Sequence, residues 1–209
     1  MKFYDCSTAP SPRRVRMFIA EKGIEIETVD VNLRDGEHFS EEFRAINPDC
    51  VVPVLALDNG RHLTEALAIC HYLEESYPEP NLLGTTAEER ARVLEWNAKV
   101  EQQGLMSMMD ALRNASKGMA DRALTGPVNY PQIPALAERG RARVLQFFER
   151  IDAHLADNEY LAGERFTMSD ITAFVLVDFA AWVKLALPDE ANHARRWYAA
   201  VSGRDSASA

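Results

Sequence analysis

A proline stands inside a run of β-branched residues, at Val51–Val54, and limits what this segment can form. Proline lacks the N–H that a central strand needs for its ladder of hydrogen bonds, so Pro53 indicates an edge strand, a bulge or a cis turn. A cis bond at Pro53 would turn the backbone of Val52 outward and leave its N–H and C=O free. Those two groups could then pair with an extended peptide that adds as a further strand.

Residues 1–78 alternate short strand and helix patterns in the order β-α-β-α-β-β-α, which predicts an α/β domain. The first helix begins at Pro10, is capped by Gly23, and fits a crossover between two parallel strands. A slip in the alternation near Thr28 suggests a bulge in the second strand. Thr64 can cap the last helix, with Glu65 in its first turn. The predicted strands cover residues 2–6, 24–31, 51–57 and 62–64, and the middle helix covers residues 40–46.

Residues 86–201 carry helical patterns only, after a proline-rich linker at Tyr77–Asn81, and predict a separate all-α domain. Thr167 and Asp170 form a capping box at the start of a helix that is apolar on all sides. Such a helix must be buried at the centre of its domain. We expect the polar tail, Ser202–Ala209, to be disordered.

Composition narrows the class of protein. No apolar run approaches the ~20 residues that span a bilayer, and the first residues lack the apolar stretch of a signal peptide, so we expect a cytoplasmic protein without a membrane partner. The net charge of −9 opposes binding to nucleic acid. Cys6, Cys50 and Cys70 are the only cysteines and form no CxxC pair. We therefore expect reduced thiols, and neither a disulfide framework nor a metal site.

A basic cluster lies in the first predicted helix, at Arg13, Arg14 and Arg16. It suits either a solvated helix face or the attraction of an anionic ligand, and the sequence leaves both interpretations open.

The most specific pattern combines Asn47-Pro48, Val52-Pro53-Val54-Leu55 and the run Leu63–Ile69. At this spacing, with a thioredoxin-like order of elements and a helical second half, the chain resembles the glutathione S-transferases over residues 1–201. The resemblance implies a thioredoxin-like N-terminal domain (1–78) and a helical bundle domain (86–201) that forms the wall of the electrophile site. It also implies a cytoplasmic homodimer that acts in detoxification, with glutathione as co-substrate and a small electrophile as the other substrate.

The resemblance also assigns residues to the glutathione site. In such enzymes the residue before the cis-proline, here Val52 before Pro53, binds the cysteinyl backbone of glutathione. The acidic residue and its successor, here Glu65 and Ala66, bind the γ-glutamyl group, although the family usually has serine or threonine at the second position. His38 lies where some plant relatives place a histidine for the glycyl carboxylate.

Simple electrostatics is consistent with the assignment at Glu65. The first turn of its helix presents free N–H groups and the positive end of the helix dipole, which suit the γ-glutamyl α-carboxylate. The Glu65 carboxylate can pair with the ammonium. The methionine-rich stretch after Leu105 (Met106, Met108 and Met109) belongs either to the core or to a pocket for an apolar co-substrate.

The position that usually activates the thiol falls on Ala9, which has neither hydroxyl nor thiol. Nearby side chains could replace it: Ser11 is the first choice, Thr8 the second and Ser7 the third. Since Pro10 and Pro12 supply no N–H, the expected backbone donors are the amides of Ser11 and Arg13.

We therefore expect a glutathione transferase that activates the thiolate for attack on a hydrophobic electrophile. Two alternatives remain open. One is a glutathione-dependent thiol-disulfide oxidoreductase in which Cys6 attacks a mixed disulfide. The other is a non-catalytic glutathione-binding or regulatory module, which the alanine at position 9 supports.

Overall fold

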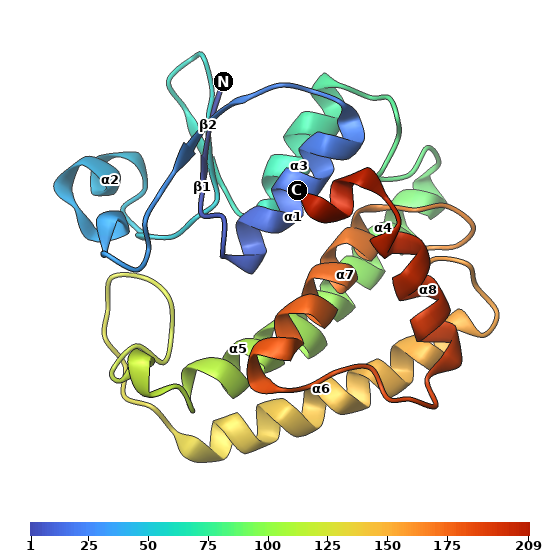
Figure 1. Ribbon diagram of the computed structural model, residues 1–209. Helices are drawn as coiled ribbons and strands as arrows, with labels where there is room; N and C mark the ends of the chain where they lie inside the picture. The colour runs from blue at the N-terminus through green and yellow to red at the C-terminus, as the bar shows by residue number, and fades with distance from the viewer.

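The computed structural model describes residues 1–209 and contains an α/β domain followed by a helical domain (Figure 1). The first domain has the predicted order of strands and α-helices, with one added turn of 3-10 helix, η1. Its elements are β1 (Lys2–Asp5), α1 (Pro10–Lys22), β2 (Glu27–Asp30), η1 (Glu37–Phe39), α2 (Glu41–Ile46), β3 (Val54–Ala56), β4 (His62–Thr64) and α3 (Ala66–Ser76).

The four strands form one mixed sheet in the order β2-β1-β3-β4. β1 and β2 are parallel and are joined through α1, as predicted, while β3 runs antiparallel to both β1 and β4. Side chains alternate across the sheet, so Phe3 and Leu55 join the core beneath α1 and α3. On the opposite face Val54 packs with Phe43 of α2 (Figure 1).

Two strands begin later than their sequence patterns predict. β3 begins only at Val54, because Pro53 cannot donate to the ladder, and β2 begins at Glu27 rather than at residue 24. The predicted bulge near Thr28 is absent, since the pairing runs without a skipped residue from Lys2↔Glu27 to Asp5↔Asp30.

The second domain consists of helices, and none of them combines the length and the apolar character that crossing a membrane would require. Its elements are α4 (Ala87–Lys99), η2 (Val100–Leu105), α5 (Met106–Arg113), η3 (Lys117–Met119), α6 (Pro134–Leu155), α7 (Met168–Ala180), η4 (Ala181–Val183), α8 (Asn192–Ser202) and η5 (Asp205–Ser208).

Two glycines allow these helices to approach closely. A Cβ at Gly104, in the π-helical segment η2 between α4 and α5, would lie 2.3 Å from Leu176 Cδ2 of α7. A Cβ at Gly140 of α6 would lie 2.4 Å from the carbonyl oxygen of Ser107. The Gly140 contact is with backbone atoms, which cannot move aside, so this position needs glycine for α6 to pack against α5. At Gly104 the side chains of Leu176 and Phe147 would have to shift.

Helix α7 is the buried centre of the domain, as its all-apolar sequence predicts, and its capping box is formed by Thr167 and Asp170. The Asp170 carboxylate also accepts hydrogen bonds from Leu161 N and Trp197 Nε1, both at 2.9 Å. It therefore joins the start of α7 to the preceding loop and to α8. Burial raises the pKa of Asp170 to about 6, while its hydrogen bonds act in the opposite direction.

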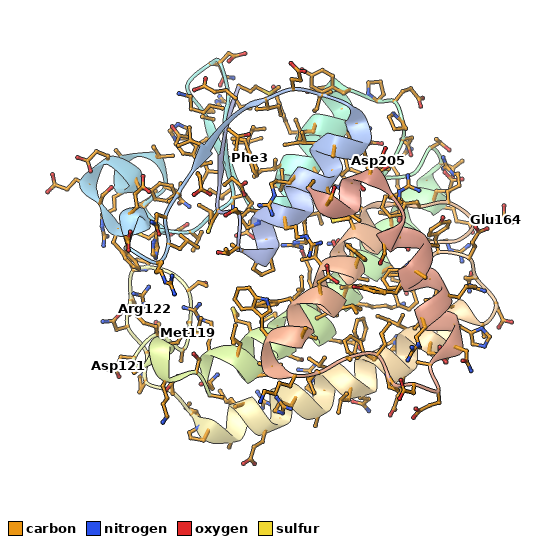
Figure 2. All side chains as sticks on the ribbon, viewed as in Figure 1. Phe3, Met119, Asp121, Arg122, Glu164 and Asp205 are labelled. Atoms are coloured by element: carbon orange, nitrogen blue, oxygen red, sulfur yellow. The ribbon has the colours of Figure 1, made fainter.

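The sequence predicts a disordered tail, and that prediction is wrong. Residues 205–208 form η5, which packs along α1 (Figures 1 and 2). Arg204 donates two hydrogen bonds to the Glu21 carboxylate, at 2.8 and 2.7 Å, and Ser206 donates a third. The serine- and alanine-rich composition of the tail gives no sign of these contacts, because their partner is 183 residues away.

We expect Asp170→Asn to lower the free energy of unfolding by about 3 kcal/mol at pH 7, because an amide presents an NH₂ group to a site that contains only donors. Urea denaturation followed by circular dichroism measures this loss. Asp157→Asn is the matched control, since Asp157 is exposed and its side chain makes no hydrogen bond, and its effect should stay within ~0.5 kcal/mol. Equal stabilities of the two variants would contradict the role given to Asp170.

Candidate functional site

The sheet brings the predicted ligand-binding segments to one edge. Tyr4 lies opposite Val54 in the β1–β3 pair, and Val54 lies opposite Thr64 in the β3–β4 pair. The chain therefore leaves β1, enters β3 and leaves β4 at the same end of the sheet. The turn before α1, the Val52-Pro53 segment and Glu65 are thus neighbours in space.

The Val52–Pro53 peptide bond is cis, as predicted. Val52 lies outside β3, and neither its N–H nor its C=O makes a hydrogen bond within the chain. A backbone donor and acceptor that lie side by side without partners can pair with an extended peptide. The structure thus shows the cis bond and the free backbone groups of Val52 that the sequence predicts.

Glu65 and Ala66 lie at the start of α3, with one correction to the sequence prediction. The residue before the helix is Glu65 rather than Thr64, and it adopts a left-handed φ of 67°. The first helical hydrogen bond runs from Ile69 N to the Glu65 carbonyl oxygen, so the amides of Ala66 and Leu67 precede it and are free. The Ala66 side chain is buried, whereas the Glu65 side chain is exposed.

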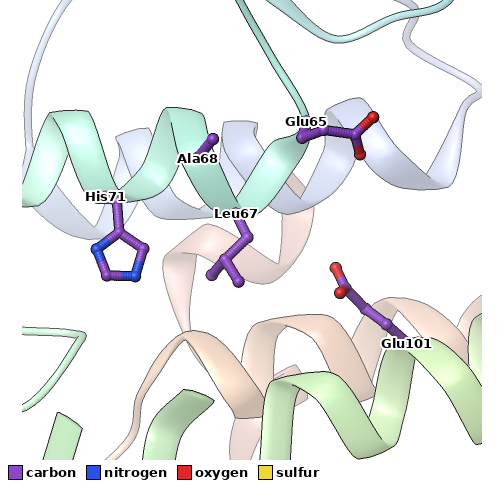
Figure 3. A pocket seen from close by; sticks show the side chains of 5 residues that line it. All are labelled: Glu65, Leu67, Ala68, His71 and Glu101. Carbon is purple, nitrogen blue, oxygen red and sulfur yellow. The ribbon is translucent and has the colours of Figure 1, made fainter.

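A hollow of about 590 Å³ lies between this helix start and the helical domain. Its lining includes Glu65 from the first domain and Glu101 from η2, and Figure 3 shows the two carboxylates on opposite sides of the opening. Arg14 pairs with Glu101 at 2.5 Å. Two carboxylates and one arginine leave this hollow with excess negative charge, which suits an ammonium group.

The first turn of α1 offers one free backbone donor. Pro10 and Pro12 have no N–H, and Arg13 N–H donates to the Ala9 carbonyl oxygen at 3.2 Å. The prediction that the Arg13 amide is available is therefore wrong. The Ser11 N–H remains without a partner, and Ala9 provides no side-chain cap.

The candidate hydroxyl groups beside this turn face different surroundings. Thr8 is exposed and lines a second hollow, of about 400 Å³, and its Oγ1 lies 3.5 Å from Cys6 Sγ. Ser7 lines the same hollow. The Ser11 hydroxyl instead contacts Arg14 Nη2 at 3.5 Å. Cys6 is only 6% exposed, which restricts the attack on a mixed disulfide that the oxidoreductase alternative requires.

The second hollow lies between α1, α7 and the tail. Val175, Phe179 and Trp182 form an apolar wall, while Ala207–Ala209 of the tail close another side. Phe179 and Trp182 meet edge to face with centroids 5.3 Å apart, and Trp182 is 56% exposed. The methionines Met106, Met108 and Met109 line neither this hollow nor the first.

The three arginines of α1 fit neither interpretation of the basic cluster. Arg13 pairs with Asp178 at 2.6 Å, Arg14 with Glu101 at 2.5 Å and Arg16 with Asp5 at 2.6 Å. They are neither a solvated face nor free cations, because each one is neutralised by a carboxylate. Arg13 also binds the Ala207 carbonyl oxygen at 2.9 Å, so it joins α1 to both α7 and the tail.

His38 lies in η1, on the α2 side of the sheet. Its Nδ1 is buried without a hydrogen-bond partner, and its ring lies 3.8 Å from the ring of Phe39. Burial lowers the pKa of His38, and the positive charges of Arg122 and Arg113 lower it further. Both arginines belong to the helical domain, so the surroundings of His38 are built from both domains.

Some residues at the two hollows carry no functional signal in the sequence. Glu101 is one of many acidic residues on charged helices, and Trp182 follows the end of the predicted central helix. Val175 and Phe179 stand in a segment that the apolar pattern already placed at the domain centre. The structure contains no group of three or more His, Cys, Asp and Glu side chains that could hold a metal ion.

We expect the pKa of His38 to lie below about 6.5, and we expect Arg122→Gln to raise it because one repelling positive charge is removed. Titration of the histidine ring signals by NMR measures both values, with the His38 signal assigned from its loss in His38→Asn. Arg61→Gln is the control: it removes an exposed arginine from the first domain, which also carries His38, and should leave the pKa of His38 unchanged. A pKa that does not respond to Arg122→Gln would show that the two side chains are not in electrostatic contact.

Comparison with known proteins agrees with this geometry. Residues 8–76 match the description "Glutathione S-transferase, N-terminal domain" and residues 116–205 match "Glutathione S-transferase, C-terminal domain". Glutathione S-transferase 2 of Saccharomyces cerevisiae is 34% identical over 209 residues, which cover 99% of this chain and 87% of that protein.

Solved structures give the same result. The crystal structure of a glutathione S-transferase domain-containing protein from Marinobacter aquaeolei matches with a TM-score of 0.91 and 34% identity, over 99% of each chain. That of Gtt2 from Saccharomyces cerevisiae matches with a TM-score of 0.90 and 34% identity, over 99% of this chain and 98% of the other. The chain thus belongs to the glutathione S-transferase family.

Proposed function

We propose that this protein binds glutathione at the shared edge of its sheet and transfers the glutathione thiolate to a hydrophobic electrophile. The observation that carries the proposal is the unpaired backbone of Val52, next to Pro53 and to the free amides that begin α3. Membership of the family supports glutathione as the ligand that these groups accept.

Each part of glutathione has a matching partner in this proposal. The backbone of its cysteine pairs with the N–H and C=O of Val52, as an added strand. Its γ-glutamyl α-carboxylate accepts hydrogen bonds from the free amides of Ala66 and Leu67. Its ammonium lies by the carboxylates of Glu65 and Glu101. The glycyl carboxylate extends toward His38.

The thiol loses its proton to solvent, and the first turn of α1 stabilises the resulting anion. The Ser11 N–H and the positive end of the helix dipole are available there, and the hydroxyl of Thr8 or Ser11 adds a hydrogen bond. The sulfur then forms a bond to the electrophilic carbon, and the displaced electron pair leaves with the leaving group. Because Ala9 adds nothing to this step, backbone and neighbouring side chains must perform it.

The second hollow is the proposed electrophile site, since Thr8 lies on its wall next to the turn before α1. Its apolar wall of Val175, Phe179 and Trp182 favours a planar, hydrophobic substrate. We further propose that the protein is a homodimer that acts in detoxification, and the family relationship supports both proposals. We also propose that it is cytoplasmic, which its three buried, unbridged cysteines support.

Replacement of Glu65 tests the ammonium contact. We expect Glu65→Gln to weaken glutathione binding by about tenfold or more, because the bound ammonium loses a charged partner. Isothermal titration calorimetry measures the affinity. Glu75→Gln removes an exposed carboxylate further along the same helix and should leave it unchanged. An unaltered affinity in Glu65→Gln would refute the assignment of Glu65.

Titration of bound glutathione tests thiol activation. A free thiol has a pKa near 8.5, and we expect the bound thiol to titrate lower, as measured by thiolate absorbance. Thr8→Ala or Ser11→Ala should raise this pKa if the hydroxyl contributes, whereas Thr28→Ala on β2 should not. If neither variant raises it, the Ser11 amide and the helix dipole act without a hydroxyl. If the wild-type pKa is not lowered at all, the non-catalytic binding module becomes the better function.

A further inference from the structure

We propose that Arg122, carried by the helical domain, binds the glycyl carboxylate of glutathione together with His38 and so completes the glutathione site across both domains. This inference rests on the proposed function and adds a ligand-binding residue to it. His38 of the first domain and Arg122 of the helical domain both contact one aromatic ring, that of Phe39.

Arg122 is positioned like a ligand-binding cation. Its guanidinium carbon lies 4.4 Å from the centroid of the Phe39 ring, a cation–π contact that helps to hold the group in place. Its Nε is buried without a hydrogen-bond partner, and its side chain forms no ion pair and donates no hydrogen bond. In a chain with a net charge of −9, an arginine without any carboxylate partner suits an anion from outside the chain.

His38 belongs to the first domain and lies beside this contact. Its ring packs at 3.8 Å against the same Phe39 ring, and its Nδ1 is also buried without a partner. Two buried nitrogen atoms without hydrogen-bond partners, on neighbouring side chains, lower the stability of the fold. Such pairs are unusual, since buried polar groups nearly always find partners. A carboxylate between the two side chains would gain a charge-assisted hydrogen bond from the arginine and a second bond from the imidazole.

The loop that carries Arg122 is held in place before any ligand arrives. Arg113 Nε donates to the Arg122 carbonyl oxygen at 3.0 Å, and Tyr130 N donates to the Asp121 carbonyl oxygen at 2.9 Å. Ala123 N returns a hydrogen bond to the Tyr130 carbonyl oxygen at 3.1 Å. These bonds close residues 121–130 into a fixed loop. Figure 2 shows Asp121 and Arg122 of this loop beneath the helix labelled α2 in Figure 1. The arginine therefore needs little ordering when it binds.

The position of this loop indicates which end of glutathione it meets. A Cβ at Gly126 would lie 3.5 Å from the Asp49 carbonyl oxygen, so the loop touches the segment that leads into Val52. Glu65 begins α3, on the face of the sheet opposite α2. With the cysteine paired to Val52 and the γ-glutamyl group at Glu65, the end that extends toward α2 and the loop is the glycine. That end carries one carboxylate.

Comparison of two ligands tests the inference directly. We would titrate the protein with glutathione and with its glycyl ethyl ester, in which an uncharged ester replaces that carboxylate. We expect Arg122→Gln to weaken the binding of glutathione by about tenfold or more and to leave the binding of the ester almost unchanged. Arg122→Lys keeps the charge but not the planar group, so its loss should be smaller. Arg61→Gln, the control, should change neither affinity.

The outcomes separate this inference from the proposed function. Wild-type protein that binds neither ligand would overturn both. Wild-type protein that binds both, with Arg122→Gln weakening the two equally, would show that the arginine acts only through the structure of the loop and would overturn the inference alone. An unchanged affinity for glutathione in Arg122→Gln would overturn it as well. Thermal unfolding of each variant checks that the domains remain folded.

Discussion

One buried carboxylate, that of Asp170, helps to place the candidate site although it lies in the core of the helical domain. It accepts hydrogen bonds from the capping residue of α7, from the preceding loop and from Trp197 of α8. These bonds fix the helix that carries Asp178 toward the first domain. Asp178 in turn holds Arg13, in the first turn of α1, at 2.6 Å. The free amide of Ser11 is therefore positioned by a series of polar contacts that begins at the centre of the other domain.

The sheet supplies the second constraint, because its register places three separate segments at one edge. Each segment contributes backbone groups without partners: the Ser11 amide, both groups of Val52 and the first amides of α3. Backbone donors held by strands and helices do not need to be ordered upon binding. In the proposed site, the main chain thus supplies the groups that bind the ligand, and alanine at positions 9 and 66 removes none of these backbone groups.

Local signals in the sequence predicted much of the fold, and the contacts between distant residues escaped prediction. Gly23 caps α1 and Thr167 with Asp170 caps α7, as expected, because capping depends on a few consecutive residues. The Val52-Pro53 turn was predicted from the proline inside a β-branched run, whereas the start of α3 was predicted one residue early, with Thr64 as its cap. The left-handed Glu65 was missed, since the junction with β4 imposes it. The contact of Arg122 with Phe39 and the packing of the tail on α1 were missed as well. The local sequence around a loop arginine or a serine-rich tail does not depend on whether a distant contact partner exists.

The contact between the tail and α1 also bears on how the protein is made. Glu21 leaves the ribosome long before Arg204, since 183 residues separate them. At ~5–20 residues per second, the interval between them is on the order of ten to forty seconds. During that time the nascent first domain lacks the cover that η5 provides for α1, and its outer face is open to chaperones or to early aggregation. Residues 204–208 therefore complete the surface of the first helix only after most of both domains has been translated.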